Sequence, residues 1–308
     1  MNPEYSIIIP AYHAANSIEK LFNELQSFFN SINSSFETVI VDDASSDNTW
    51  DVLKSLKAKN PNIKIIRFAK NFGQHSATLC GFSFVKGKFV ITMDDDLEVH
   101  PSQILKLIEE QKKSDNDVVY GEYKKINQSL LRSALSGFYK FGSKIEGKNK
   151  GKGSSFRLIK SELALKLSKE HRHFTFIDEL LLWYTDKISF LKVEANKNFI
   201  ERRRYSLTGL FRMTGNVVMF SSTVPLRFVT RIGSTLAIVN FLIGTFYLLK
   251  KFLFKTPVPG FTSIIVSVLF STGLIVLSIG IVAQYISKIL KDVNNKPSYY
   301  ISEKFADD

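Results

Sequence analysis

Three consecutive aspartates end an apolar run in the segment ITMDDDLEVHP, residues 91–101. Carboxylates so close together repel one another unless a positive group lies between them. A hard divalent cation meets this need, because one or two carboxylates hold Mg²⁺ while phosphate oxygens of a substrate complete its coordination shell. If the chain stays extended, Asp94 and Asp96 point to one side and Asp95 to the other. The pattern therefore predicts a metal and phosphate site at Asp94 and Asp96, with Glu98 as a further ligand or hydrogen-bond acceptor.

Polar residues also follow the other apolar runs of the N-terminal region. Pro10 and Tyr12 follow the first run, Asp42 and Asp43 follow the second, and residues 71–74 follow the third. Asp42 is nearest to the end of its run, where its carboxylate could accept hydrogen bonds from a base or a ribose hydroxyl. In open α/β sheets, ligands bind beyond the carboxyl ends of the strands. These clusters and the three aspartates are therefore expected to share one site.

Short apolar runs rich in β-branched residues alternate with helical patterns in this region. The predicted strands are residues 5–9, 38–41, 63–68, 89–93 and 118–120. The predicted helices between them are residues 17–29, 49–58, 76–85 and 102–112. Strands that are apolar on both faces and alternate with helices indicate an α/β fold, Rossmann-like, with a mainly parallel sheet.

Several classes of site are excluded by motifs that the sequence lacks. It contains neither a G-x-G-x-x-G nor a G-x-x-x-x-G-K phosphate loop, so a dinucleotide or ATP-hydrolysing site is not supported. It has no Cys and His spacing for zinc, and its single cysteine, Cys80, cannot form an internal disulfide. The formal charge of +12 suits an anionic membrane surface, so no nucleic acid partner is expected.

The C-terminal third contains two long uncharged stretches, residues 232–249 and 261–286. Each is long enough to cross a hydrocarbon core of about 30 Å. Two buried helices of a soluble core are the alternative, but such helices rarely stay apolar all round over this length. The sequence predicts a transmembrane hairpin. Basic residues are concentrated on the side of the large domain, so both termini are expected in the cytoplasm.

The chain is thus expected to have four parts. Residues 1–204 form the catalytic domain, and residues 205–228, amphipathic with sparse arginines, form a helix in the membrane interface. Residues 229–287 form the transmembrane hairpin, and residues 288–308 form a cytoplasmic tail. The expected location is the cytoplasmic membrane, with the catalytic domain facing the cytoplasm.

Five segments carry a family resemblance when they are taken in order. They read IIIPAYHAANSIEKLF, VIVDDASSDNTW, KNFGQHSATLCGF, MDDDLEVHP and SSFRLI. As a set they resemble the inverting family-2 glycosyltransferases of GT-A fold, and within these the enzymes that load a sugar onto a polyprenyl phosphate such as undecaprenyl or dolichyl phosphate. The resemblance covers roughly residues 4–210, and the hairpin is also typical of the bacterial branch.

The resemblance implies a donor site for a nucleotide sugar. Pro10 and Tyr12 would flank the base, and Asp42 would bind the base or the ribose. Asp94 and Asp96 would hold Mg²⁺ or Mn²⁺ against the diphosphate. The remaining donor-site residues that it implies are Asp95, which is not a primary metal ligand, Arg157, and the pair Arg204 and Tyr205, which would close over the diphosphate.

The resemblance also implies an acceptor site. Arg132 and Ser136, in SLLRSALSG, match an R-x-x-x-S pattern that meets the acceptor phosphate in mannose synthases of this kind. Membrane lipid is a further expected partner, and the resemblance leaves open whether the chain forms a homo-oligomer. A phosphate acceptor is anionic at neutral pH, so no general base is required, and His13 and His75 are interpreted as residues of the site wall or as structural residues.

Two motifs depart from the family pattern. The usual P-x-Y-N-E reads PAYHAAN, so Ala14 stands in place of a glutamate. The late R-x-x-G-x-S-K/R-Y reads NFIERRRY, with Asn198, Glu201 and Arg203 at the arginine, glycine and serine positions. These departures leave the identity of the donor open.

Three functions other than that of a polyprenyl-phosphate glycosyltransferase are compatible with parts of the sequence. The same fold could transfer a sugar to a growing or lipid-linked glycan. A non-catalytic membrane scaffold would explain the altered motifs, but the intact pair Asp94 and Asp96 argues against it. An aspartyl-phosphate receiver using Asp42 and Asp43 lacks a suitable lysine after a later strand and leaves the hairpin unexplained.

Overall fold

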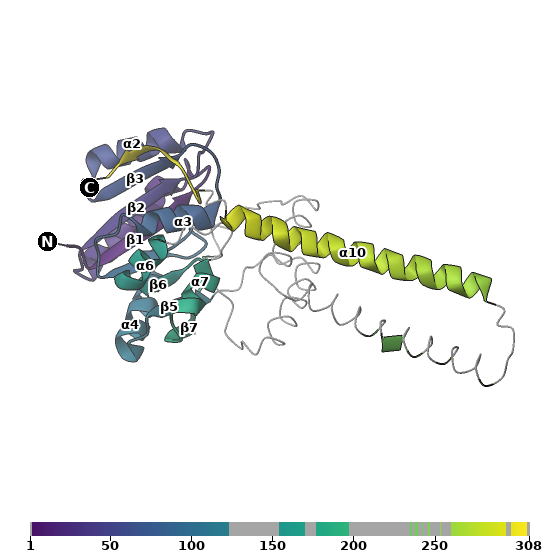
Figure 1. Cartoon of the computed structure of the whole chain (residues 1–308). Helices are drawn as coiled ribbons and strands as arrows, with labels where there is room; N and C mark the ends of the chain where they lie inside the picture. The colour runs from purple at the N-terminus through teal and green to yellow at the C-terminus, as the bar shows by residue number, and fades with distance from the viewer. Residues whose placement is uncertain are drawn as a thin grey trace. The chain divides into compact units, whose positions relative to one another are not determined.

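The computed structural model describes residues 2–122, 154–169, 177–196, 260–293 and 297–306, together with six single helical positions between residues 235 and 253. The chain divides into two compact units (Figure 1). The first comprises residues 1–134, 148–204 and 295–308, and the second residues 135–147 and 205–294. The last residues of the chain thus belong with the first unit, which the predicted division into parts did not anticipate.

The first unit is built on an eight-stranded sheet with the order β7-β5-β6-β4-β1-β2-β3-β8. Its four central strands are parallel: β1 (Tyr5–Ala11), β2 (Phe36–Asp42), β3 (Ile63–Phe68) and β4 (Phe89–Thr92). The outer strands are β5 (Val118–Glu122), β6 (Arg157–Lys160), β7 (Ile188–Lys192) and β8 (Ile301–Phe305). β6 is antiparallel to β4 and β5, and β8 is antiparallel to β3.

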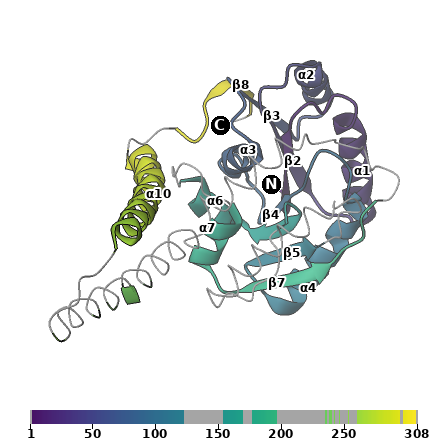
Figure 2. The ribbon, with the colours of Figure 1, turned by 90° about the vertical axis from the view of Figure 1, so that its right-hand side faces the viewer.

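Helices cover both faces of this sheet (Figure 2). One face buries apolar side chains of α1 (Ile18–Ser31), α2 (Thr49–Lys59) and α4 (Ile104–Ser114), which follows the short 3₁₀ helix η1 (Pro101–Gln103). The other face buries those of α3 (Gln74–Phe82), α6 (Ser161–Ser168) and α7 (Ile177–Tyr184). The predicted α/β fold with a mainly parallel sheet is confirmed, and all five predicted strands and four predicted helices form within a few residues of their expected bounds. β7 falls in the stretch ISFLKVEA, which is strand-like in sequence, whereas the strands β6 and β8 were not predicted.

A buried ion pair lies near the starts of the central strands, at the edge opposite to the predicted site. The Lys64 ammonium lies 2.7 Å from the Glu37 carboxylate, and both side chains are 7% exposed. Glu37 also accepts hydrogen bonds from the Ser6 hydroxyl at 2.6 Å and from the backbone N–H of Lys86 at 2.5 Å. At Gly87 any Cβ would meet the backbone nitrogen of Ser6 at 2.7 Å, so only glycine fits. This network ties the chain that enters β4 to β1 and β2.

The second unit contains the helix α10 (Phe261–Val293), of which the structure describes the whole backbone and part of the side chains. Within the described residues, none of the helices is found to combine the length and the hydropathy that crossing a membrane requires. The predicted amphipathic segment 205–228 lies outside the described residues, as does the predicted span 232–249 apart from five single helical positions. The transmembrane hairpin therefore stays a prediction.

Candidate active site

The three aspartates lie just beyond the end of β4. Asp95 is buried, and its carboxylate accepts a hydrogen bond from the backbone N–H of Tyr12 at 3.1 Å. Asp94 and Asp96 on either side of it are partly exposed. Asp95 and Asp96 lie in a turn, so the chain does not stay extended there as the sequence argument assumed, and a shared side for Asp94 and Asp96 stays a prediction. Asp95 links the end of β4 to the end of β1.

Two other segments contact Asp94. The Gln74 side-chain amide, at the start of α3, donates to one oxygen, and the Ser155 hydroxyl, just before β6, donates to the other at 2.7 Å. Asp96 accepts from the backbone N–H of Glu98 at 3.0 Å. Among the described residues no group of three or more acidic, His or Cys side chains is assembled to hold a metal ion. The donor set here is two partly exposed carboxylates, which suits a cation whose other ligands come from substrate phosphates.

The loop that follows β3 is held by Asp43. Its carboxylate accepts hydrogen bonds from the backbone N–H groups of Phe72 at 2.7 Å and Gly73 at 2.8 Å. Gly73 has φ of 91°, a left-handed conformation that glycine adopts without strain. Because the next residue is Gln74, Asp43 places the amide that contacts Asp94. The four polar clusters predicted from the sequence are thus brought together.

Asp42 ends β2 and is fully buried. One carboxylate oxygen accepts from the backbone N–H of Ser45 at 3.1 Å, and the other lies 3.3 Å from Nε of Arg67. That second oxygen has no hydrogen-bond partner within the described part of the chain. Burial raises the pKa of Asp42 above its ordinary value, against the lowering effect of Ser45 and Arg67. The Arg67 guanidinium therefore compensates this buried carboxylate, and its contact with a nucleotide stays a prediction.

Tyr12, which follows β1, presents an aromatic surface next to β2, the strand that Asp42 ends. Its side chain is 41% exposed, and its ring stacks on His13 with 4.1 Å between centroids and an interplanar angle of 16°. Nε2 of His13 lies 3.0 Å from the Ser46 hydroxyl. Pro10 is buried within β1. The exposed ring of Tyr12 is therefore available for a planar ligand such as a base.

Arg157 begins β6 and is buried, with 3% exposed. Its Nε donates to the Thr92 hydroxyl at 3.0 Å, and its Nη1 forms an ion pair with Asp178 of α7. Asp178 also accepts from the Tyr120 hydroxyl at 3.0 Å. Arg157 thus connects β4, β5 and α7 beneath the acidic cluster, and its contact with a nucleotide sugar stays a prediction.

The imidazole of His75, one residue beyond Gln74, faces this network. Burial, with a further contribution from Arg157, lowers its pKa from 6.5 to about 4, while Asp178 acts in the opposite direction. His75 is therefore neutral at pH 7, which agrees with the interpretation of this residue as structural.

This shifted pKa predicts an acid-dependent loss of stability. Between pH 6.5 and 4 the unfolded chain binds a proton at His75 that the folded chain does not, so the free energy of unfolding falls as the pH falls, by up to about 3 kcal/mol. Denaturant unfolding at pH 7 and pH 4.5 should show a smaller decrease for His75→Gln than for the wild type. Equal decreases in the two proteins would contradict this assignment.

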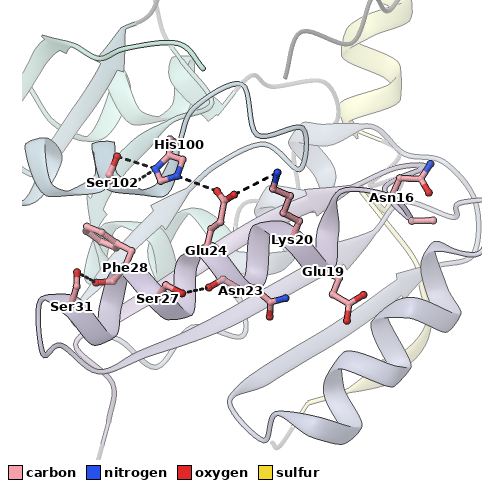
Figure 3. A pocket seen from close by; sticks show the side chains of 11 residues that line it. Asn16, Glu19, Lys20, Asn23, Glu24, Ser27, Phe28, Ser31, His100 and Ser102 are labelled. Carbon is pink, nitrogen blue, oxygen red and sulfur yellow. Dashed lines mark hydrogen bonds and ion pairs between the residues drawn. The ribbon is translucent and has the colours of Figure 1, made fainter. Parts of the chain in front are cut away.

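A groove lies along α1 and contains none of the predicted site residues (Figure 3). Within the groove, Glu24 lies 3.3 Å from His100 Nε2 and 4.0 Å from the Lys20 ammonium, so these three side chains contact one another. The other lining residues are short or polar side chains of α1, its preceding turn and η1, together with Phe28. We assign no ligand to this surface.

Four predicted site residues lie outside the described residues: Arg132, Ser136, Arg204 and Tyr205. Gln74 belongs to the cluster 71–74 that was expected at the site. Conversely, the structure places three unpredicted side chains at or beneath the site: Arg67, Ser155 and Asp178. A signal for Arg67 was present, since a charged residue near the end of an apolar run is unusual. Gln74 and Ser155 lay in segments already singled out, but nothing in their spacing indicated a contact with Asp94.

Similar folds occur among solved structures. The chain resembles glucosyl-3-phosphoglycerate synthase from Mycobacterium tuberculosis, solved in complex with uridine diphosphate, with a TM-score of 0.51 and 15% identity over 70% of this chain and 78% of that one. At this identity the likeness concerns the fold alone.

Relatives extend along almost the whole chain. CsbB of Bacillus subtilis is 33% identical over 305 residues, which is 97% of this chain and 91% of that protein. The bactoprenol glucosyl transferase of Shigella flexneri is 27% identical over 97% of both chains. The undecaprenyl-phosphate 4-deoxy-4-formamido-L-arabinose transferase of Yersinia pestis is 27% identical over 97% of this chain and 92% of its own.

The model of one family, Glycosyl transferase family 2, matches residues 6–174. This range is more than half of the chain and contains the ends of β1, β2, β3 and β4 with their converging polar side chains. With this match and relatives that share nearly its full length, the chain belongs to glycosyl transferase family 2 and is a glycosyltransferase.

Proposed function

We propose that this enzyme transfers a sugar from a nucleotide-sugar donor to a polyprenyl phosphate of the undecaprenyl type, at the cytoplasmic face of a membrane. The observation that carries the proposal is that relatives named for bactoprenol and undecaprenyl phosphate match 97% of this chain. The similarity therefore includes the apolar C-terminal third as well as the family domain.

The donor is assigned to the ends of β1 and β2. The exposed ring of Tyr12 would stack on the base, and the buried acceptor oxygen of Asp42 would receive a base N–H or a ribose hydroxyl. Pro10, Asp95 and Arg157 would support this site from within the sheet, and Arg204 with Tyr205 would close over the diphosphate.

Mg²⁺ or Mn²⁺ is assigned to the partly exposed carboxylates of Asp94 and Asp96. Glu98 stays a predicted further ligand, although the described residues do not assemble it with the other two. When bound there, the cation would neutralise the charge that develops on the leaving diphosphate. Gln74 and Ser155 hold Asp94 from two sides, so its oxygens are oriented before any substrate arrives. Such orientation avoids the reorganisation that a mobile carboxylate would require during the reaction.

The acceptor is assigned to the membrane side. Arg132 and Ser136 would bind the acceptor phosphate, whose oxygen attacks the anomeric carbon. A new C–O bond forms as the bond to the diphosphate breaks, the configuration inverts, and the nucleoside diphosphate leaves. The phosphate oxygen is already anionic near neutral pH, so no side chain has to remove a proton.

Membrane attachment is proposed through the hairpin of residues 232–249 and 261–286. Its support is the charge-free sequence of both stretches, the helical backbone of α10 across the second, and large apolar side chains that α10 exposes, including Ile264, Phe270 and Ile279. A polyprenyl chain stays in the bilayer, so an enzyme that uses it needs such an anchor.

A reconstituted assay tests the proposed function. The full-length chain in detergent, given undecaprenyl phosphate, Mg²⁺ or Mn²⁺ and a panel of labelled nucleotide sugars, is expected to form a labelled lipid from one of them. Undecaprenol, which lacks the phosphate, is the matched control and should yield none, and EDTA should abolish the product. The proposal would be contradicted if the chain formed no labelled lipid and bound none of the donors. A product formed only with lipid-linked saccharide would indicate a glycan acceptor.

A further inference from the structure

The C-terminal strand β8 lies beside β3 at the edge of the catalytic sheet, although more than 200 residues separate the two strands in sequence. Antiparallel pairing places Ile65 opposite Phe305 and Arg67 opposite Glu303, with a register shift between Arg67 and Phe68. The backbone N–H of Ala69 continues the contact by donating to Tyr300 at 3.0 Å. Figure 2 shows β8 next to β3. The end of the chain is thus part of the sheet whose strand ends carry the active site.

A row of directly paired residues crosses the sheet at this level. Ala11 of β1 is paired with Asp42 of β2, Asp42 with Arg67 of β3, and Arg67 with Glu303 of β8. Residues directly opposite one another in neighbouring strands point to the same face, and opposite charges in such positions attract. Arg67 therefore lies between two carboxylates, one buried in the site and one on the C-terminal strand.

The measured contacts follow this register. Arg67 Nε lies 3.3 Å from the buried Asp42 oxygen, and its Nη1 lies 3.8 Å from Glu303. Its Nη2 donates to the backbone carbonyl of Ser45 at 3.1 Å, in the loop that follows Asp42. The guanidinium carbon is 5.5 Å from the centre of the Trp50 ring. The planar fork of an arginine is suited to meeting these groups at once.

Trp50 connects Glu303 to the same cluster from α2. Its indole N–H donates to the second Glu303 oxygen at 3.3 Å, and its ring packs near Phe305 with 6.1 Å between centroids. Trp50 is buried whereas the Glu303 side chain is 48% exposed. Glu303 is therefore oriented by Trp50 on one oxygen while it attracts Arg67 with the other.

We propose that β8 is a functional part of the donor site, in which Glu303 positions Arg67 and Arg67 holds the Asp42 carboxylate for the nucleotide. This inference rests on the proposed donor role of Asp42. Arg67 and Glu303 are positioning residues, because neither needs to touch the nucleotide itself. A strand that only covered the edge of β3 would not need a row of charged side chains aligned with Asp42. The backbone of any strand can pair with the open N–H and C=O groups of such an edge.

Nucleotide affinity tests this proposal. Binding of UDP and of GDP to the full-length chain in detergent with Mn²⁺ is measured by calorimetry for the wild type, Glu303→Gln and Arg67→Met. Glutamine keeps an acceptor for Trp50 but removes the charge, so Glu303→Gln is expected to weaken binding up to about fivefold, as for a partly exposed ion pair. Arg67→Met should weaken nucleotide binding about tenfold or more, and the affinity of Arg67→Lys should lie between those of the wild type and Arg67→Met.

Lys304→Gln is the matched control. It removes a charge from the same strand, but Lys304 lies over Phe84, which packs with the other core cluster, and nucleotide affinity should not change. In steady-state assays Glu303→Gln should raise the donor KM and leave kcat within about twofold, the pattern of lost ground-state binding.

The outcomes separate this inference from the proposed function. If the wild type binds UDP or GDP and Glu303→Gln binds equally well, the inference is overturned and the proposed function stands, even if the variant melts at a lower temperature. If the wild type binds neither nucleotide, the inference is overturned, while the proposed function is decided by the labelled-lipid assay. Because Glu303 is half-exposed, its variant is expected to fold even where Arg67→Met does not.

Discussion

Replacing Asp94 with asparagine is expected to reduce turnover about a hundredfold or more while leaving the fold intact. Asparagine fits the same volume between Gln74 and Ser155, but its amide nitrogen donates where a carboxylate oxygen accepted, so one of these two hydrogen bonds must reverse its direction as the negative charge is lost. A catalytic cation supplies several kcal/mol of charge stabilisation, and about 2.7 kcal/mol corresponds to a hundredfold in rate. The measurement is single-turnover transfer from labelled donor over a range of Mn²⁺ concentrations.

Asp95→Asn is the matched comparison for this prediction. Asp95 is buried and its carboxylate accepts from Tyr12 N–H, so it is not expected to contribute to the charge seen by the cation as Asp94 does. The Mn²⁺ concentration for half-maximal activity should rise strongly for Asp94→Asn and stay near the wild-type value for Asp95→Asn. Equal metal dependence in all three proteins would contradict the assignment of the cation to Asp94.

Replacing Lys64 with methionine is expected to cost about 3 to 5 kcal/mol of the free energy of unfolding. The substitution leaves Glu37 buried without its cation, and an uncompensated buried charge is costly. Glu37 keeps its hydrogen bonds from Ser6 and Lys86, which cannot replace the lost ion pair. Denaturant unfolding followed by tryptophan fluorescence measures the change.

Two further variants complete that experiment. Lys54→Met breaks an ion pair with Asp51 whose side chains are 45% and 74% exposed, and it should cost less than about 1 kcal/mol. Adding Glu37→Gln to Lys64→Met removes the stranded charge and should recover part of the stability. A similar loss of the free energy of unfolding in Lys64→Met and Lys54→Met would mean that the buried ion pair contributes no more to stability than the exposed one.

The central part of the fold was predictable because its signals are local. β1, β2, β3 and β4 are short runs apolar on both faces, and α1, α2 and α4 repeat their apolar side chains at helical spacing. β8 gave no such signal. It reads ISEKF, with two charged residues on an exposed edge, and only its pairing with β3 stabilises it as a strand. β6 has four residues and was missed for the same reason.

The candidate site divides in the same way. The types and order of Tyr12, Asp42, Asp94 and Asp96 indicated from sequence that acids and an aromatic ring end parallel strands, and parallel strands bring their ends to one edge. The sequence did not reveal that Arg157 is buried in a pair with Asp178, because a charged side chain in a strand normally points to solvent.

The sequence alone therefore determined the family and the fold class, and it supplied the acids of the proposed metal site, since each depends on residue types at short spacing. The tertiary structure decided the partners: Asp95 with Tyr12, Asp94 with Ser155, Lys64 with Glu37, and Glu303 with Arg67 and Trp50. Trp50 and Glu303 are separated by 253 residues. Contacts at such separation depend on which strands become neighbours and in what register, and a register is set by the packing of the whole sheet rather than by any local run of residues.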